Sequence, residues 1–394
     1  MRTAILHGRV ITPFQVIEDG NVLVENGKIL AVQDGSAAIA AADDVFDAEG
    51  LYVSPGFVDI HTHGGGGFDY MDGTPEAFIG AAKTHLRFGT TSLTPTTLSC
   101  SDEELFTVLR CYETVKAEWT DGPNLLGMHL EGPYFAPTQA GAQDPKYLRL
   151  PDAAHVQSLL DASGNIVRMS AAAELPGALA LGDELKKRGI LASIGHSDAL
   201  YTDAIEAVKH GYSLVTHLYS GMSMLKRIGA WRHLGLVESA YLLDELNVEI
   251  IADGCHLPPE LLQLIVKLKP WDKICLITDS MRGAGLPEGA VVKLGSLENG
   301  QDVILENGVA MLMDRTAFAG SICTADRCIR TMVEKAGLPL EDAVRMMTLN
   351  PARLIGAASK GVITPGYDAD ICVFGDNVQI KRVMVGGEFR YIEA

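Results

Sequence analysis

The residues of this chain with the clearest capacity for chemistry are histidines and carboxylates that directly follow apolar segments. His61 and His63 follow the segment Phe57–Ile60, and because side chains alternate between the two faces of a strand, both imidazoles are expected on one side. Four further residues of this kind follow later apolar segments: Glu131, His196, His217 and Asp279. Imidazoles and carboxylates bind divalent ions such as Zn²⁺ or Fe²⁺. The set predicts a metal site; the alternative for the first pair is two solvated loop histidines.

This donor set predicts metal-assisted hydrolysis, because a divalent ion lowers the pKa of a bound water to about 7 and so supplies a nucleophile at neutral pH. Asp279 is the expected acid/base, which takes a proton from the attacking water and returns it to a leaving nitrogen. His256 follows another apolar segment, and we expect it to polarise a carbonyl group or to bind substrate. Four consecutive glycines, Gly64 to Gly67, leave room for a substrate beside His63.

Neighbouring histidines, acids and cysteines have simpler explanations. His129 is expected to pack within its strand, and Cys255 to lie in the core. Asp198 and Asp253 are expected to act as caps or as hydrogen-bond acceptors behind the site. The other histidines are expected on the surface or behind the site: His85, His155, His210 and His233.

Between Ser54 and about Gly356 the chain alternates between strand-like and helix-like segments. Eight strands are predicted, at Gly56–Ile60, Thr91–Pro95, Leu125–His129, Val167–Ala171, Leu191–Ile194, Leu214–Thr216, Val248–Ile251 and Ile274–Thr278. Helices are predicted at Pro75–Phe88, Ser101–Val115, Leu179–Lys187, Ala199–Lys209 and Pro258–Leu268. Eight such units favour an α/β fold of the (β/α)₈ TIM-barrel type, whose strand ends converge on one face. The alternative is a doubly wound open sheet, but its Gly-x-Gly-x-x-Gly fingerprint is absent.

Both ends of the chain have a different, strand-rich character. Near the start, Asn26-Gly27 separates two β-branched segments and predicts a hairpin. Strands are predicted at Thr3–Ile11, Val22–Val24, Ile29–Val32, Ala369–Phe374 and Val378–Val385. We therefore expect a small β-sandwich domain built from residues 1–54 and 357–394, with the barrel, residues 55–356, inserted between them.

Composition excludes several classes of function. The 394 residues are 47% hydrophobic, carry a formal charge of -18 and have a pI near 5.0, which argues against nucleic-acid or anionic-membrane surfaces. Seven cysteines, an odd number without a Cys-x-x-Cys pair, indicate reduced thiols. The start of the chain lacks the apolar segment of a signal peptide, and no uncharged apolar run is long enough to span a bilayer. We expect a cytoplasmic enzyme.

Several motifs occur in a familiar order across nearly the whole chain. They are Pro55–His63, His129–Pro133, Gly195–Asp198, Thr216–Tyr219, Ala252–His256, Ile277–Asp279, Gly285–Pro287, Ala319–Ser321, Asn350–Ala352, Gly361 and Gly366–Asp370. With these motifs the chain resembles the amidohydrolase superfamily and, within it, the branch that deacetylates amino-sugar phosphates. Hydantoinases and dihydroorotases of this superfamily carry a carboxylated lysine after the fourth strand. This chain has Ala171–Glu174 there, without a lysine, and Glu131 after the third strand can serve as a ligand.

The resemblance implies hydrolysis of N-acetylglucosamine-6-phosphate to glucosamine-6-phosphate and acetate, with one or two divalent ions. N-acetylgalactosamine-6-phosphate or another N-acyl amino sugar is the alternative substrate, and a non-catalytic sugar-phosphate sensor is the alternative of a different class. The implied principal metal ligands are Glu131, His196 and His217, and His61 and His63 complete a second site. The resemblance also implies that Asp279 is the acid/base and that His256 contacts substrate. It places the sugar pocket at backbone near Ala142, Ser220, Gly221, Phe318, Ala319 and Gly320.

The sequence departs from this branch after His217. Its members usually continue Asn-Ala-Met and then His-His-Arg-Glu-Pro, whose arginine binds phosphate across a homodimer interface. This chain instead has Ser220-Gly221-Met222 and then the segment 226–232. Arg227 or Arg232 is expected to bind the phosphate, since a guanidinium can donate two hydrogen bonds to it. The alternative is that both are solvated cations beside a helix.

Overall fold

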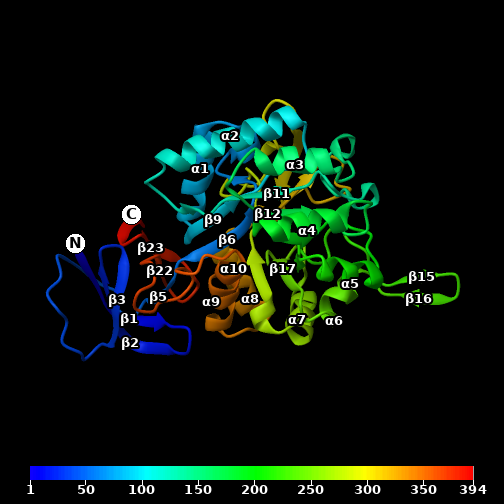
Figure 1. The fold of residues 1–394 in the computed structure, drawn as a ribbon. Coiled ribbons are helices and arrows are strands. Elements are labelled where there is room, and N and C mark those ends of the chain that lie inside the picture. Colours follow the sequence, from blue (N-terminus) through cyan, green and yellow to red (C-terminus); the bar gives the residue numbers. More distant parts are fainter. Residues whose placement is uncertain (394) are drawn as a thin grey trace.

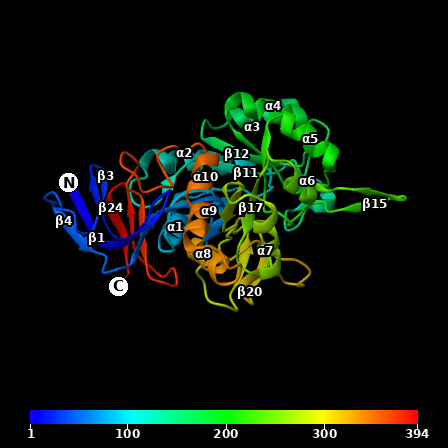
Figure 2. The same ribbon diagram turned by 90° about the horizontal axis from the view of Figure 1, so that it is seen from below.

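The computed structural model describes residues 1–393. A β-sheet formed by both chain ends occupies one end of the molecule, and a larger curled parallel sheet wrapped by helices forms the rest (Figure 1). The view from below shows the same two parts, with strands from the beginning and the end of the chain side by side (Figure 2).

The terminal sheet has eight strands in the order β24-β23-β22-β5-β1-β2-β3, with β4 paired to β1. They are β1 (Arg2–Ile11), β2 (Val16–Glu25), β3 (Lys28–Asp34), β4 (Asp44–Asp47), β5 (Tyr52–Pro55), β22 (Ile371–Phe374), β23 (Ile380–Val385) and β24 (Glu388–Ile392). The predicted hairpin joins β2 to β3, and both Asn26 (φ 50°) and Gly27 (φ 78°) have the left-handed backbone that such a turn needs. The two ends meet where β5 pairs antiparallel with β22.

The parallel strands lie in two sheets, of order β10-β9-β6 and β11-β12-β13-β14-β17-β18. They are β6 (Phe57–Thr62), β9 (Thr90–Pro95), β10 (Asn124–Leu125), β11 (Met128–Glu131), β12 (Ile166–Ala171), β13 (Leu191–Ile194), β14 (Tyr212–Val215), β17 (Asn247–Ile251) and β18 (Ile274–Ile277). All eight predicted strands are present; the third is interrupted at Gly127 (φ 141°), which separates β10 from β11. Isolated parallel bridges join Thr96 to His129 and Thr62 to Ser280, so the sheet curls around on itself.

Helices cover the outside of the parallel strands (Figure 1). They are α1 (Pro75–Leu86), α2 (Asp102–Glu118), α3 (Ala153–Asp161), α4 (Ala178–Arg188), α5 (Tyr201–Lys209), α6 (Leu236–Leu242), α7 (Pro259–Leu268), α8 (Ala325–Glu334), α9 (Leu340–Met347) and α10 (Leu349–Leu354). The five predicted helices are confirmed with small shifts at their ends. α2 begins at a capping box, in which Ser101 Oγ accepts from the Glu104 N–H and the Glu104 carboxylate accepts from the Ser101 N–H. Within residues 1–393 no helix is both long enough and apolar enough to span a membrane.

Short elements interrupt this pattern where the sequence pattern did not predict strands. They are β7 (Gly64–Gly65), β8 (Phe68–Asp69), the hairpin β15 (Lys226–Ile228) and β16 (Trp231–His233), and the antiparallel sheet β19 (Val291–Leu294), β20 (Gln301–Glu306) and β21 (Val309–Leu312). Single 3₁₀ turns occur at Tyr70–Asp72, Pro137–Gln139, Pro145–Tyr147 and Trp271–Lys273. Arg227 and Arg232 lie opposite each other in the β15–β16 hairpin, which turns at Gly229 (φ 61°), and the exposure of both side chains agrees with the alternative of two solvated cations.

Candidate active site

The polar residues at the ends of the parallel strands meet in one place. His61 lies within β6 and Glu131 is the last residue of β11, while His196, His217 and Asp279 each come two residues after β13, β14 and β18. All are buried, as is His63. The structure therefore brings together the six side chains that the sequence pattern predicted as neighbours.

Three of these residues have a backbone conformation that is uncommon for a residue with a side chain. The φ angles are 47° at His196, 28° at His217 and 47° at Asp279. Surrounding hydrogen bonds hold this strained geometry: the Asp279 N–H donates to His61 O at 2.9 Å, and Asp279 O accepts from Ser321 N at 3.0 Å. The left-handed turn at each strand end directs the side chain toward the common site, and backbone strain of this kind clusters at functional sites.

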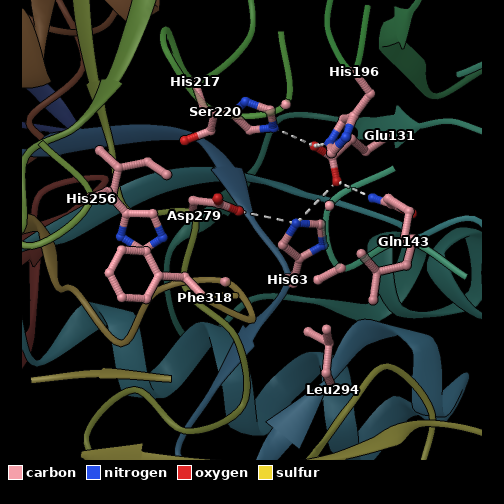
Figure 3. Close-up of a pocket in the computed structure, with 16 residues that line it drawn as sticks. His63, Glu131, Gln143, His196, His217, Ser220, His256, Asp279, Leu294 and Phe318 are labelled. Carbon is pink, nitrogen blue, oxygen red and sulfur yellow. Dashed lines mark hydrogen bonds and ion pairs between the residues drawn. The ribbon is translucent and has the colours of Figure 1, made fainter. Parts of the chain in front are cut away.

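Glu131 is the centre of one group of possible metal donors. Its Oε1 lies 3.3 Å from His196 Nε2 and 3.0 Å from His217 Nε2. Its Oε2 lies 3.4 Å from His63 Nε2 and accepts a 2.8 Å hydrogen bond from Gln143 Nε2 (Figure 3). Glu131, His196 and His217 each offer a donor atom within 4.8 Å of the others.

A second group consists of His61, His63 and Asp279, whose donor atoms also lie within 4.8 Å of one another. Asp279 Oδ1 is 3.2 Å from His63 Nε2 and 3.4 Å from His61 Nε2. His61 Nε2 is also 3.5 Å from Glu131 Oε1, so the two groups adjoin.

These donors fit divalent metal ions. His61 Nε2 is buried without a hydrogen-bond partner among residues 1–393, although carboxylate oxygens surround it. His196 Nδ1 donates to Gln139 O at 2.8 Å, which leaves the lone pair of its Nε2 facing Glu131. Buried imidazole nitrogens that face carboxylate oxygens form a donor set that a cation completes.

The charges of the site act on its titratable groups. Burial alone would lower the pKa of His63, but the Asp279 and Glu131 carboxylates raise this pKa to about 9. Burial alone would raise the pKa of Asp279, but the adjacent His61 and His63 lower it. Asp279 is therefore ionised at neutral pH, and the site favours positive charge.

A cavity of about 240 Å³ opens beside the two groups (Figure 3). Its walls include His63, Glu131, His196, His217 and Asp279 together with six residues of the predicted pocket: Ala142, Ser220, Gly221, His256, Phe318 and Gly320. Ala319 is fully buried outside this lining. Arg227 and Arg232 are both exposed and do not line the cavity, because their hairpin projects from the end of the molecule opposite the terminal sheet (Figures 1 and 2).

His256 is held on the cavity wall by its neighbours. Its Nδ1 lies 2.7 Å from Asp253 Oδ2, and Asp253 Oδ1 accepts hydrogen bonds of 2.8 Å from the His256 and Cys255 N–H groups. The Phe318 ring lies against the imidazole, with 4.7 Å between ring centroids. Because Asp253 accepts the Nδ1 proton, Nε2 remains free for a ligand. Asp253 is thus the hydrogen-bond acceptor that was predicted.

Other predictions near the site have mixed outcomes. His129 is buried within β11, as predicted, but Cys255 is only partly buried and lies beside Arg327, so its predicted place in the core is wrong. His85 is fully buried behind the four consecutive glycines, and its Nε2 lies 2.9 Å from Gly64 O. Sequence reasoning missed Gln143, although it directly follows Ala142, a predicted pocket residue.

Comparisons of the sequence and of the structure with known proteins agree on one family. The sequence model of the amidohydrolase family matches residues 52–390. The N-acetylglucosamine-6-phosphate deacetylase of Lysinibacillus sphaericus is 32% identical over 95% of this chain and 94% of the relative. The N-acetylgalactosamine-6-phosphate deacetylase of Escherichia coli O157:H7 is 30% identical over 96% of this chain and 97% of the relative. A mutant N-acetyl-D-glucosamine-6-phosphate deacetylase from Mycobacterium smegmatis, solved in complex with N-acetyl-D-glucosamine-6-phosphate, superposes with a TM-score of 0.89 at 29% identity and covers 99% of both chains.

Proposed function

The chain belongs to the amidohydrolase family, and from this premise we propose that it hydrolyses the acetamido group of N-acetylglucosamine-6-phosphate to glucosamine-6-phosphate and acetate. One observation carries the proposal: two adjoining groups of buried imidazoles and carboxylates border a single cavity, with Asp279 on its wall. The relatives named as deacetylases support the substrate class, since this chain matches them over nearly its whole length.

The residues present would hold one or two divalent ions, of which zinc and iron suit the donors best. Glu131, His196 and His217 would hold the principal ion, and His61, His63 and Asp279 a second. A bound divalent ion supplies a Lewis acid and an acidified water. Two groups of donors that share one cavity support this assignment.

The proposed chemistry divides between two side chains. The Asp279 carboxylate accepts a proton from the attacking water and then gives it to the sugar nitrogen as the C–N bond breaks, so that acetate and the amine leave. His256 would donate from Nε2 to the carbonyl oxygen, where negative charge develops, in its doubly protonated form, with the Nδ1 proton held by Asp253. The ionised state of Asp279 at neutral pH leaves its carboxylate able to accept the proton, and the Asp253 contact that fixes the His256 ring supports the second role.

Backbone and side chains on the cavity wall are proposed to bind the sugar, namely Ala142, Ser220, Gly221, Phe318 and Gly320, together with Ala319, which is buried beside them in the chain. Arg227 or Arg232 is proposed to bind the phosphate of a substrate held by a second copy of the chain in a homodimer. The projecting hairpin supports this arrangement, because both arginines are exposed and lie away from the cavity of their own chain.

N-acetylgalactosamine-6-phosphate is a second possible substrate. The Escherichia coli relative that carries this name matches the chain about as well as those named for the gluco substrate. A non-catalytic sugar-phosphate sensor is less well supported, since the proposed acid/base Asp279 is present.

The setting of the site is also a proposal. We infer that β6, β9, β11 to β14, β17 and β18 close into a (β/α)₈ barrel of residues 55–356, and the two isolated bridges between the sheets support closure. Residues 1–54 and 357–394 would form a separate small β domain, which the shared terminal sheet supports, and we propose that this sheet folds over into a β-sandwich. All seven cysteines are free, which supports a cytoplasmic enzyme.

The test is acetate release by zinc- or iron-loaded protein from N-acetylglucosamine-6-phosphate, its galacto epimer and unphosphorylated N-acetylglucosamine, with a chelated sample as the control. Fast release from the first sugar that the chelator abolishes is the expected result. Preference for the epimer would transfer the assignment to the galacto substrate. No release from either phosphorylated sugar would reject the proposed function.

A further inference from the structure

A buried ion pair lies directly behind His61, on the side away from the cavity. His61 Nδ1 is 3.4 Å from Glu249 Oε2. The Glu249 carboxylate in turn pairs with the Arg168 guanidinium, with Nη2 2.8 Å from Oε2 and Nη1 in contact with Oε1. All three side chains are fully buried and come from different strands, β6, β17 and β12.

Arg168 is fixed by contacts on several sides. Its Nε donates to Ser193 Oγ at 3.0 Å, its Nη1 to Ile60 O at 3.0 Å and its Nη2 to Thr216 Oγ1 at 3.2 Å. Every nitrogen of the guanidinium therefore has a partner. Glu249 faces a cation that cannot turn away, so the orientation of the Glu249 carboxylate is fixed as well.

A buried ion pair is unusual among side chains that lie between parallel strands. The interior of a parallel barrel is normally packed with branched apolar side chains, and a buried ion pair stabilises a fold no better than such side chains do. The pair is thus poorly explained by stability. Its one contact with the proposed site is the contact between Glu249 and His61.

No other described residue can orient His61 in the same way. The His129 ring lies against it, with 4.7 Å between centroids, but the nitrogens of His129 are already used by Thr96 Oγ1 and Ser170 Oγ. The Nε2 atom of His61 has only Glu131 and Asp279 oxygens nearby and no hydrogen-bond partner. Glu249 is therefore the acceptor for the ring proton.

We propose that Glu249, locked by Arg168, is a positioning residue that keeps the proton of His61 on Nδ1 and so directs the Nε2 lone pair at the second metal position. This inference rests on the proposed function, because it takes the His61, His63 and Asp279 group as a site for an ion. Orientation of a ligating imidazole by a carboxylate typically changes metal affinity 10- to 100-fold. The chain is accordingly built to bind two ions.

The test counts ions and needs no substrate. Apoprotein is titrated with Co²⁺, and absorption spectra and metal analysis give the number of ions per chain and their affinities. The variant Arg168→Met/Glu249→Leu removes both charges together, so that no unpaired buried charge remains. The variant Arg168→Met/Glu249→Gln keeps an acceptor oxygen near His61. Lys360→Met/Asp370→Leu removes another mostly buried ion pair, 2.6 Å long and beside the terminal sheet, as the matched control. Asp368, which also contacts Lys360, keeps its pair with Lys28.

Wild-type protein and the control are each expected to bind two ions, one more tightly than the other, and each affinity should be the same in both proteins. The Arg168→Met/Glu249→Leu variant should bind the weaker ion at least tenfold less tightly than wild-type protein does, with no change in the affinity for the tighter ion. The Arg168→Met/Glu249→Gln variant should recover most of the lost affinity. Unchanged affinity in the Leu variant, equal losses in both variants, or a single ion in wild-type protein would overturn the inference. Failure of the proposed function is separate, because it would appear as absent acetate release from the same wild-type sample.

A second measurement keeps the proposal testable if the Leu variant does not fold. Nitrogen-15 NMR of histidine-labelled wild-type apoprotein reports which ring nitrogen carries the proton, and His61→Gln identifies the signal. A proton on Nδ1 is expected. A proton on Nε2 would overturn the inference without any variant of the ion pair.

Discussion

Gln143 bridges the main chain and the proposed metal site: its Nε2 donates to Glu131 Oε2 at 2.8 Å, while its Oε1 accepts from the Ser99 N–H at 2.8 Å. One carboxylate oxygen of Glu131 is thereby occupied, and the other is left to face His196 and His217. The amide thus sets the rotation of the Glu131 carboxylate. Because Gln143 is almost fully buried, water does not replace these hydrogen bonds, and the Glu131 carboxylate keeps this orientation.

Replacing Gln143 by methionine should therefore weaken binding of the principal ion about 10- to 100-fold, since Met fills the space but neither donates nor accepts the two hydrogen bonds. Isothermal titration with Zn²⁺ measures the change. Gln157→Met, on the exposed face of α3, is the control and should bind as wild type does. An unchanged zinc affinity in Gln143→Met would show that Glu131 needs no such support.

Asp279→Asn should abolish most turnover while the principal ion stays bound. An amide cannot accept the proton of the attacking water, and loss of a general acid/base lowers kcat about 10²- to 10⁴-fold. Acetate release and metal content are measured on the same preparation. Activity near the wild-type value would reject Asp279 as the acid/base.

His256→Gln should lower kcat about 10²-fold or more with a smaller effect on KM, because a hydrogen bond to the developing oxyanion is lost in the transition state. Cys255→Ser is the matched control: its position adjoins His256 in the chain but does not line the cavity, so kcat should stay close to wild type. Equal losses in both variants would point to a general disturbance of the loop instead.

Arg227 and Arg232 of the hairpin should affect KM only for phosphorylated substrates. Arg227→Ala/Arg232→Ala is expected to raise KM for the sugar phosphate about tenfold or more, since charged hydrogen bonds contribute about 1.5–3 kcal/mol each. The single variants show which arginine acts. Arg110→Ala, exposed on α2, should leave KM unchanged. If the double variant retains the wild-type KM, the two arginines are solvated cations.

Asp368 makes the terminal sheet sensitive to acid. Burial alone would raise the pKa of Asp368, but Lys28, Ser359 and Lys360 lower it to about 2. A carboxyl whose pKa is depressed in the folded state stabilises the fold above its unfolded value of about 3.9, and this contribution is lost as the pH falls toward 2.

Asp368→Asn should consequently lower Tm at pH 7, and the difference from wild type should shrink between pH 4 and pH 3. Calorimetry across this range measures it, with Glu260→Gln at an exposed position of α7 as the control. A difference in Tm that stays constant from pH 7 to pH 3 would contradict the role assigned to the charge of Asp368.

The residues of the candidate site could be predicted from the sequence, whereas the residues that position them could not. Strand ends carrying His63, Glu131 or Asp279 can be recognised in the sequence because a parallel fold must bring such ends together. Glu249 could not be recognised in this way: it sits within a predicted apolar strand, and its partner Arg168 is 81 residues away in the chain. Contacts of that range depend on the register of neighbouring strands, which a local pattern does not contain.

The strands within the connecting segments could not be predicted from a local pattern either. The β15–β16 hairpin contains few β-branched residues, and its turn at Gly229 has no Asn-Gly or Asp-Gly pair like the one that marked the first hairpin. The sheet of β19, β20 and β21 was likewise outside the repeating strand and helix pattern, although Leu294 at its edge lines the cavity. Segments inserted after strand ends are shaped by the requirements of the site, so the repeating strand and helix pattern does not predict them.

The pairing of β5 with β22 has a consequence for the synthesis of the chain. When Pro55 leaves the ribosome, its partner Ile371 is still roughly 300 residues from being made. At the usual 5–20 residues per second this interval lasts about 15–60 s. Throughout it, β5 presents an unpaired strand edge, the kind of surface on which nascent chains associate wrongly. The eight-stranded sheet can therefore be completed only when translation is almost finished.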